Sequence, residues 1–305
     1  AVLAGRDLDH LVAAARSRDF APVPLGVATS LVLDNDVRRY ATANVAAWLP
    51  GRDPKLADEV VVYSAHHDHF GIKTSPDGKR EIYNGALDNA AGVAQMLAIA
   101  RAFTALPEPP RRSILFLAVA AEEQGLLGSE YFVKHPPVPV RQMIANLNVD
   151  GGNVFGRTTD IGVVGLGKSS LDDQLAAAAA AQGRTLADDP FPDRGMFYRS
   201  DQLNFARAGV PALFPRPGVL YVGHPPQWGT EQVDAWIERN YHQASDDWDP
   251  SWDLTGMVDD ARLAFGPRGL AIHPRSRGPQ GCAADRLARG ALHRAGKMLH
   301  RVDRG

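Results

Sequence analysis

Five short segments of this sequence carry side chains that bind divalent metals in proteins. Most of them follow a run of apolar residues that is typical of a buried strand. The set contains two histidines and three carboxylates, with further carboxylates beside them, and zinc binds both imidazole nitrogen and carboxylate oxygen. Such an inventory is typical of a two-zinc hydrolase with its own general base. The side chains are His66, Asp68, Asp88, Glu122, Glu123, Asp150 and His242.

The histidine-rich segment Ala-His-His-Asp-His places two polar groups on one side of the chain. In an extended segment, residues two apart point the same way, so His66 and Asp68 share a face and His67 points away. A metal-bound imidazole needs a carboxylate or carbonyl partner on its other nitrogen, and Asp68 could supply one. The alternative interpretation is a polar strand end with surface histidines.

Two adjacent glutamates follow the eight apolar residues 114–121. Carboxylates at the end of a buried strand repel each other and are costly to bury without partners. A divalent cation resolves this by binding one, while the other stays beside a bound water. The alternative is that Glu122 and Glu123 both face solvent at a helix start, where carboxylates are favourable.

The other three candidates are weaker when each is considered alone. Asp88 precedes an asparagine and could be part of a helix cap, Asp150 lies in a turn-like Asn-Val-Asp-Gly-Gly, and His242 could be a surface histidine. Together, however, five ligands with one bridging carboxylate give each of two zinc ions three protein donors and an open position for water.

The elements that must position these residues alternate along the chain. Val93, Met96, Leu97, Ala100 and Phe103 define one face of a helix that begins near Asp88. Strands followed by helices indicate an α/β fold, a doubly wound and mostly parallel central sheet with helices on both faces. In that fold ligands bind at the carboxyl ends of the strands, where the candidate residues occur. Strands are predicted at 30–48, 59–65, 113–121, 143–149 and 210–214, and a further helix at 171–182.

Composition excludes several other classes. The chain has 305 residues, 45% of them apolar, and a net charge of −2, so nothing favours nucleic acid or an anionic membrane as partner. No apolar stretch approaches the ~20 residues that span a bilayer. The single cysteine, Cys282, excludes an intrachain disulfide and a cysteine-ligated zinc. The oligomeric state stays open.

Four motifs give a specific resemblance. Ser-Ala-His-His-Asp-His-Phe-Gly, Asn-Gly-Ala-Leu-Asp-Asn-Ala-Ala-Gly-Val, Ala-Ala-Glu-Glu-Gln-Gly-Leu-Leu-Gly-Ser and Tyr-His-Gln resemble the co-catalytic di-zinc metallopeptidases of the bacterial leucyl aminopeptidase and aminopeptidase Y type. The similarity extends from about Leu31 to Phe265. It implies a zinc exopeptidase fold, peptide substrates and release of N-terminal residues.

The resemblance also implies a role for each matching residue. Glu122 would be the general base, Asp68 would orient a ligand histidine, and Tyr241 would donate a hydrogen bond to the developing oxyanion. Phe197 and Tyr198 could line the pocket for the N-terminal side chain, or belong to the core. The implied zinc ligands are His66 and Asp150 for one ion, Glu123 and His242 for the other, and Asp88 as the bridge.

Two parts of the chain depart from the family pattern. Residues 1–30, with a short helix at 7–16, resemble the chain returning from a protease-associated domain that is not here, so we expect a fragment with its catalytic domain at 31–265. Residues 266–305 carry eight Arg and one Lys against two Asp, a net of +7, and are unlike the relatives. We interpret this basic tail as disordered or as the product of a reading-frame change or a chimeric end.

Two alternative functions remain open on the same fold. One is a glutaminyl-cyclase-like acyltransferase, which would hold one zinc, and the other is a non-catalytic binding domain of the transferrin-receptor kind, which should have lost ligands. By resemblance alone, we expect a secreted or periplasmic protein.

Overall fold

The computed structural model describes residues 5–35 and 39–266. The predicted basic tail therefore lies outside the described residues, apart from Gly266. The chain forms two compact units, residues 1–41 and residues 42–305. In the first unit, helix α1 (Leu8–Ala15) confirms the predicted short helix. The Asp7 carboxylate caps it by accepting hydrogen bonds from the backbone N–H groups of Asp9 and His10.

The strand predicted at 30–48 is wrong over most of its length. The structure has only β1 (Val45–Leu49) there, and Leu31, Val32 and Leu33 are exposed to 78%, 95% and 74%. A strand needs a hydrogen-bonded neighbour, and within the described part of 31–44 the backbone has none of the pairing that defines one. Apolar residue types alone therefore gave the wrong prediction at this position.

The second unit is built on a five-stranded sheet with the order β1-β5-β2-β6-β9. The strands β2 (Val60–His66), β5 (Ser113–Val119), β6 (Met143–Asn148) and β9 (Ala212–Leu213) run parallel, and only β1 is antiparallel. The predicted mostly parallel sheet is confirmed, with strands slightly shorter than the apolar runs suggested.

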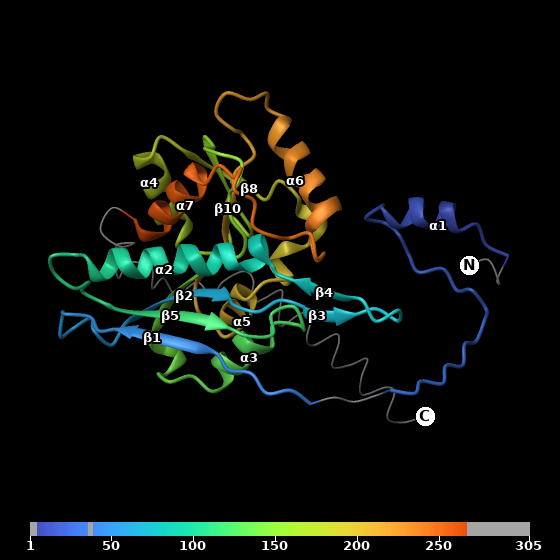
Figure 1. Cartoon of the computed structure of the whole chain (residues 1–305), viewed down its shortest axis with the longest axis horizontal. Coiled ribbons are helices and arrows are strands. Elements are labelled where there is room, and N and C mark those ends of the chain that lie inside the picture. Colours follow the sequence, from blue (N-terminus) through green and yellow to red (C-terminus); the bar gives the residue numbers. More distant parts are fainter. Residues whose placement is uncertain (1–4, 36–38, 267–305) are drawn as a thin grey trace. The chain divides into compact units, whose positions relative to one another are not determined.

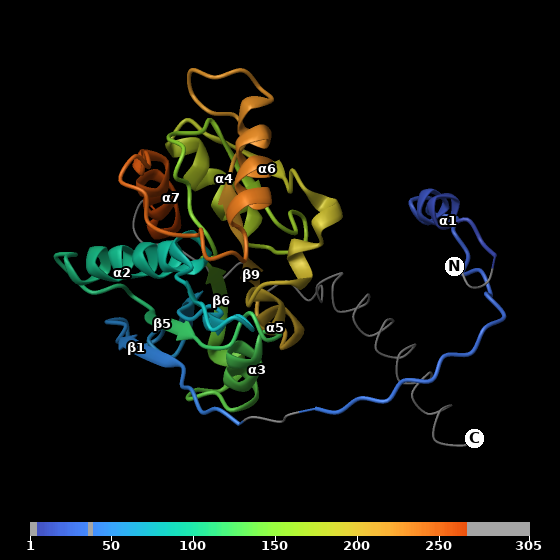
Figure 2. The same ribbon diagram turned by 45° about the vertical axis from the view of Figure 1, so that its right-hand side comes forward.

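Helices cover both faces of this sheet (Figures 1 and 2). On one face, Val61, Tyr63 and Ala65 of β2 pack in a core with helices α2 (Ala91–Thr104), α4 (Asp172–Ala181) and α7 (Thr255–Phe265). On the other face, alternate residues Val60 and Val62 pack with α3 (Leu127–Lys134) and α5 (Gln202–Arg207). This alternation explains why apolar residues occur at both sets of alternate strand positions, as in Val60–Tyr63 and Ile114–Val119.

The central strand is also hydrogen-bonded to the last described helix. The hydroxyl of Tyr63, which is buried in the sheet, donates to the backbone carbonyl oxygen of Ala264 in α7 over 2.8 Å. The ring of Tyr63 stacks on Phe116 of β5. Tyr63 thus connects the middle of the sheet to a helix that lies two hundred residues later in the chain.

One residue of the predicted helical face lies elsewhere. Leu97 is 62% exposed, whereas Ile99 is 1% exposed and packs on the sheet. The buried stripe of α2 includes Met96, Ile99 and Phe103, which lie three and four residues apart and therefore on one side of the helix. Leu97 lies one residue beyond Met96, which turns it out of that stripe.

Smaller elements complete the unit around the sheet. A second sheet pairs β10 (Pro215–Pro217), β7 (Asp160–Val163) and β8 (Thr185–Asp188). A hairpin joins β3 (Gly71–Thr74) to β4 (Arg80–Tyr83), and helix α6 covers Trp228–Asn240. Short 3-10 turns lie at Val140–Gln142, Pro192–Arg194 and Met196–Tyr198. In the described residues we find no helix with the length and apolar character that crossing a bilayer requires.

Candidate active site

The carboxyl ends of three parallel strands bring the candidate residues to one edge of the sheet. His66 is the last residue of β2 and pairs with Val119, the last residue of β5. Glu122 and Glu123 follow β5 after Ala120 and Ala121, and Asp150 comes two residues after β6. Parallel strands end at the same edge, so these side chains converge.

The first group of possible ligands surrounds His66. Its Nε2 atom lies 3.1 Å from Asp88 Oδ1 and 3.5 Å from Asp150 Oδ1. This nitrogen is buried, and neither carboxylate is aligned with it as a hydrogen-bond partner. The three side chains together form a group that could hold a metal ion.

The second group lies on the other side of Asp88. The Nε2 atom of His242 is 3.4 Å from Asp88 Oδ2 and 3.1 Å from Glu123 Oε2. The two carboxylate oxygens of Asp88 therefore face two different histidines. Each of these histidines has a second carboxylate beside it.

Local backbone geometry presents these residues. Asp88 lies in the turn Ala86–Ala90 that leads into α2, where the Asp246 carboxylate accepts hydrogen bonds from the backbone N–H groups of Leu87 and Asp88. His242 follows the C-terminal cap residue of α6, Tyr241, and has a left-handed backbone with φ 59°. This conformation is uncommon for a residue with a side chain and is typical of functional sites.

Asp68 contacts two parts of the site with different atoms. Its backbone carbonyl lies 3.0 Å from Nδ1 of His66. Its carboxylate oxygens accept from the backbone N–H of Ala121, over 2.9 and 2.8 Å. Ala121 has a left-handed backbone with φ 55° and directly precedes Glu122. The carboxylate therefore secures the turn that presents the glutamates, and the carbonyl is the group that contacts the histidine.

Two residues that the sequence reasoning did not single out lie at the site. Nδ1 of His69 is 2.6 Å from Glu123 Oε1, and the hydroxyl of Ser200 donates to Asp150 Oδ2 over 2.5 Å. His69 belongs to the same histidine-rich segment as His66 but lies beyond the end of β2. The two-residue periodicity of a strand does not apply there, so it could not predict the direction of the His69 side chain. Ser200 lies fifty residues from Asp150, and no local sequence pattern links them.

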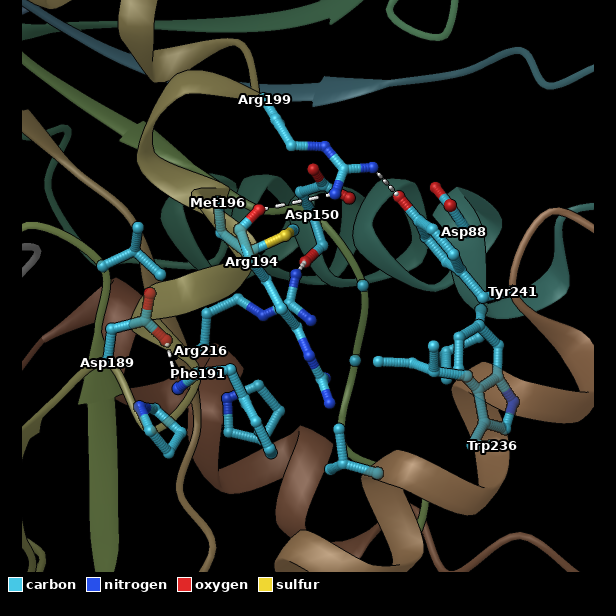
Figure 3. Close-up of a pocket in the computed structure, with 18 of the residues that line it drawn as sticks. Asp88, Asp150, Asp189, Phe191, Arg194, Met196, Arg199, Arg216, Trp236 and Tyr241 are labelled. Carbon is cyan, nitrogen blue, oxygen red and sulfur yellow. Dashed lines mark hydrogen bonds between the residues drawn. The ribbon is translucent and has the colours of Figure 1, made fainter. Parts of the chain in front are cut away.

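Figure 3 shows Tyr241 beside Asp88. Its hydroxyl oxygen accepts a hydrogen bond of 3.0 Å from Arg199, and its ring stacks on His242 at a centroid distance of 3.7 Å. Burial raises the pKa of Tyr241 above its ordinary value. The hydroxyl thus keeps its proton at neutral pH, and because its oxygen is the acceptor from Arg199, that proton is available for another partner.

Without a cation, the acidic cluster raises the pKa of both histidines. Burial alone would lower the pKa of His66, but the carboxylates of Asp150 and Asp88 raise it to about 12. Burial also opposes protonation of His242, whose pKa the carboxylates of Asp88 and Glu123 raise to about 9. Protons therefore occupy the places at which a metal ion would neutralise the carboxylates.

The two adjacent glutamates have opposite environments. Burial would raise the pKa of Glu123, but His242 and His69 lower it to about 2. Burial and the charge of Asp150 instead raise the pKa of Glu122 to about 9. In the metal-free protein Glu123 thus remains ionised, whereas Glu122 keeps its proton at neutral pH. Nearby Asp201 is fully buried, and burial raises its pKa to about 7.

A cavity of about 650 Å³ opens beside these side chains. Asp88, Glu122 and Asp150 line it at one end. Tyr198 lies in its wall, as expected, whereas Phe197 is not among the lining residues and instead packs beneath the Lys168 ammonium group at 3.9 Å. The volume is in the range of small-molecule and substrate sites.

The residues present fit zinc. Imidazole nitrogens and carboxylate oxygens are donors that zinc accepts, and the buried Nε2 of His66 lies beside two carboxylates without an aligned hydrogen bond. The contact with Asp68 leaves Nε2 of His66 directed toward the cluster, and the contact with His69 leaves Oε2 of Glu123 directed toward it.

Sequence comparison finds related proteins among the peptidases. The chain is 28% identical over 231 residues to a protein named probable leucine aminopeptidase 2 from Aspergillus oryzae, covering 72% of this chain and 43% of that protein. It is 26% identical over 188 residues to a vacuolar membrane protease from Lachancea thermotolerans, covering 60% of this chain and 18% of that protein. The chain thus spans less than half the length of these relatives.

Solved structures share the fold. LapA from Legionella matches with a TM-score of 0.50 and 21% identity, covering 73% of this chain and 58% of that one. A glutaminyl cyclase from Porphyromonas gingivalis matches with a TM-score of 0.50 and 18% identity, covering 73% and 75%. At these identities the likeness concerns the fold alone. The model of Peptidase family M28 matches residues 44–266, which include both sheets and every candidate site residue. That match covers most of the chain, which therefore belongs to peptidase family M28.

Proposed function

We propose that this chain carries the catalytic domain of a zinc-dependent exopeptidase, an aminopeptidase that hydrolyses N-terminal residues from peptides. The observation that carries the proposal is the position of Asp88. Its two oxygens face His66 on one side and His242 on the other, 3.1 and 3.4 Å away, and each histidine has a second carboxylate beside it. This is the arrangement that a bridging ligand between two metal ions requires.

The ligand sets follow from these contacts. His66 and Asp150 would hold one zinc ion, Glu123 and His242 would hold the other, and Asp88 would bridge the two. Each ion would then have three protein donors, which leaves coordination positions for water and substrate. Ser200 would fix one oxygen of Asp150, and His69 would fix one oxygen of Glu123.

Glu122 is the proposed general base. Glu122 lines the cavity and has no ion pair with a histidine among the described residues. Two zinc ions bound nearby would lower its pKa from about 9 toward neutral pH, so its carboxylate could accept a proton from the attacking water and return it to the leaving amine. Bound zinc would supply Lewis-acid polarisation of the scissile carbonyl group and would make water acidic near neutral pH. Asp68 would hold the turn at Ala121 that presents Glu122.

Tyr241 is the proposed donor to the developing oxyanion. Arg199 occupies the acceptor side of the hydroxyl, so the hydroxyl proton is free to bind a substrate oxygen. Donors of this kind contribute on the order of 3 kcal/mol to transition-state binding. The names of the curated relatives, which include leucine aminopeptidases, support an aminopeptidase specificity.

The test is the Glu122→Gln variant, assayed with aminoacyl-p-nitroanilides. Glutamine keeps the shape but has no basic oxygen, so we expect hydrolysis to fall by at least about 100-fold, the lower range for general bases, while zinc content is retained. Glu81→Gln, on the exposed hairpin, is the control and should leave the rate unchanged. Turnover by Glu122→Gln close to that of the wild type would overturn the assignment.

Metal stoichiometry separates this function from the cyclase fold neighbour. Two zinc ions per chain with chelator-sensitive peptide hydrolysis support the aminopeptidase. One zinc ion with cyclisation of N-terminal glutamine would support a glutaminyl-cyclase-like acyltransferase instead. We also propose a secreted or periplasmic location, which cell fractionation of the producing organism tests.

A further inference from the structure

Two arginines face the proposed active site without carboxylate partners. Arg199 and Arg216 both line the cavity, and Figure 3 shows them on either side of Asp150. Among the described residues, no carboxylate lies within 4.0 Å of either guanidinium group, so neither forms an ion pair. Arg194, a third arginine of the wall, differs because it is paired with Asp234 and stacks over Phe191.

Each unpaired guanidinium is held in place by a neutral oxygen. Nη1 of Arg216 donates to the backbone carbonyl of Asp150 over 3.0 Å. Arg199 donates from Nη2 to the Tyr241 hydroxyl over 3.0 Å and from Nη1 to the backbone carbonyl of Arg194 over 3.5 Å. A guanidinium group has about five N–H donors, so these bonds leave most of them unused. Arg216 is half-buried, where an unneutralised charge interacts more strongly with a ligand than it would in water.

Both nearby carboxylates have closer partners than the arginines, although the charge of Arg216 also acts on Asp150. Asp150 accepts from Ser200 and lies beside His66, and Glu123 lies between His69 and His242. If these carboxylates bind zinc, as proposed above, their negative charge is neutralised by the metal and balances the arginines even less. This end of the cavity then has a net positive field, which is complementary to an anion.

We infer that the cavity selects substrates that carry a carboxylate close to the scissile bond, and that Arg199 and Arg216 bind it. This inference rests on the proposed peptidase function and names its substrate class. Arginine suits the task because its planar N–H groups match a carboxylate in paired hydrogen bonds. The arginine beside Tyr241 places the carboxylate near the position of the reacting carbonyl group.

Two parts of a peptide can supply such a carboxylate. One is an acidic N-terminal side chain, as in a peptide that begins with glutamate. The other is the C-terminus of a short peptide, as in a dipeptide. The cavity volume of about 650 Å³ accommodates either of them. Substrate pairs that differ only in this charge identify the source.

The experiment compares matched substrates on the zinc-loaded protein. The first pair is glutamyl- and glutaminyl-p-nitroanilide, and the second is the dipeptide Leu-Gly and its C-terminal amide. We expect kcat/KM for the charged member of one pair to exceed that of the neutral member by about 10- to 100-fold, the effect of hydrogen bonds to a charged group. The pair that shows the preference identifies the carboxylate.

Variants then test the two arginines. Arg199→Gln and Arg216→Gln should each reduce the preference for the charged substrate by about 10-fold. Each variant is made separately, so a folding defect in one leaves the other as the test. Arg80→Gln, an exposed arginine on β4 that is not among the cavity-lining residues, is the matched control and should keep the full preference.

A binding measurement, which does not require hydrolysis, tests the carboxylate inference independently of the proposed peptidase function. The same peptide pairs are titrated by calorimetry into zinc-loaded Glu122→Gln. Tighter binding of the charged member supports the inference even if the wild type hydrolyses no peptide, a result that would contradict only the proposed function. Equal binding and equal hydrolysis within about twofold for both pairs would overturn the inference and leave a peptidase without charge selectivity.

Discussion

The side chain of His69 fixes the orientation of Glu123. Its Nδ1 atom lies 2.6 Å from Oε1, while Oε2 of the same glutamate faces His242 at 3.1 Å. The imidazole is nearly fully buried and packs against Phe70. Groups that orient metal ligands in this way contribute strongly to metal affinity. We therefore expect replacement of His69 to lower the zinc affinity of one proposed position while all the proposed ligands remain.

Replacing His69 should weaken one zinc ion selectively. His69→Ala removes the partner of Glu123, and we expect the affinity for one of two zinc ions to fall by about 10- to 100-fold. His69→Asn should restore part of it, because the amide N–H can occupy the place of Nδ1. His67→Ala, at an exposed neighbouring histidine, is the control. Unchanged binding of both ions by His69→Ala in a zinc titration would contradict this.

Asp201 should make the metal-free protein less stable as pH rises. Burial raises the pKa of Asp201 from 3.8 to about 7. The unfolded chain loses the proton near pH 3.8 and the folded protein only near 7, so the free energy of unfolding falls across that window. Asp201→Asn should show a smaller fall in urea unfolding between about pH 4 and pH 7. Equal slopes for wild type and variant would refute this.

Sequence reasoning predicted residues of the site better than the contacts between them. Two-residue periodicity placed the side chains of His66 and Asp68 on one face, yet the atom of Asp68 that meets the histidine is its backbone carbonyl oxygen. The carboxylate bonds to Ala121, fifty-three residues away, and only the parallel register of β2 and β5 brings these positions together. Arg216 likewise reaches Asp150 only through the packing of separate strands. Such contacts depend on tertiary structure and leave no local pattern.

At the scale of elements, the turn before α2 depends on one glycine. Gly85 has φ +63°, and a Cβ atom there would lie 2.3 Å from the carbonyl oxygen of Asp88 and 2.9 Å from the side chain of His69. No heavy atom can be tolerated at the first distance, so a side chain would displace the backbone of Asp88. The position of the proposed bridging ligand therefore depends on the absence of a side chain at residue 85.

Gly85→Ala should damage both stability and activity. We expect it to lower the free energy of unfolding by more than the ~1 kcal/mol that a left-handed alanine costs, because the added methyl also clashes. Gly78→Ala is the matched control, since Gly78 has φ +85° but a Cβ atom added to it would have no neighbour within 4 Å. Denaturant unfolding and peptide hydrolysis of both variants test this. A Gly85→Ala enzyme no worse than Gly78→Ala would contradict it.

The strands were predicted correctly where burial on both faces of the sheet requires a continuous run of apolar residues. The continuous apolar runs that became β2 and β5 were found because helices cover both sides of the sheet. The apolar triplet Leu31–Leu33 was misjudged because a strand is defined by its neighbour, which sequence composition does not reveal. In α2, Leu97 was assigned to the buried stripe because residue type alone does not separate it from Ile99.

For the whole molecule, zinc removal should destabilise the fold most at alkaline pH. The carboxylates raise the pKa of His66 to about 12 and that of His242 to about 9, in opposition to burial. Protonated imidazoles therefore stabilise the metal-free fold fully below their ordinary pKa of 6.5, and that stabilisation is lost as pH rises through about 9 for His242. Zinc needs the neutral imidazole, so its binding strengthens across the same window.

Thermal unfolding of chelator-treated and zinc-loaded protein tests this expectation. We expect the rise in Tm on zinc addition to be larger at about pH 8.5 than at about pH 6.5, since ligand binding to the folded state adds stability in proportion to the logarithm of affinity. Calorimetric zinc titration in buffers of different ionisation enthalpy should also show proton release. A zinc-induced shift in Tm that is the same at both pH values would contradict the linkage.

The hydrogen bond from Tyr63 to Ala264 has a consequence for how the chain acquires its structure during synthesis. All the proposed metal ligands precede residue 243, but the acceptor for the buried hydroxyl in the central strand arrives only with α7. Residues of α7 also belong to the core that covers Tyr63, so this side of the sheet stays open to water until that helix has emerged from the ribosome. A nascent chain can therefore carry every proposed catalytic residue before the helix that covers this side of its core has been made.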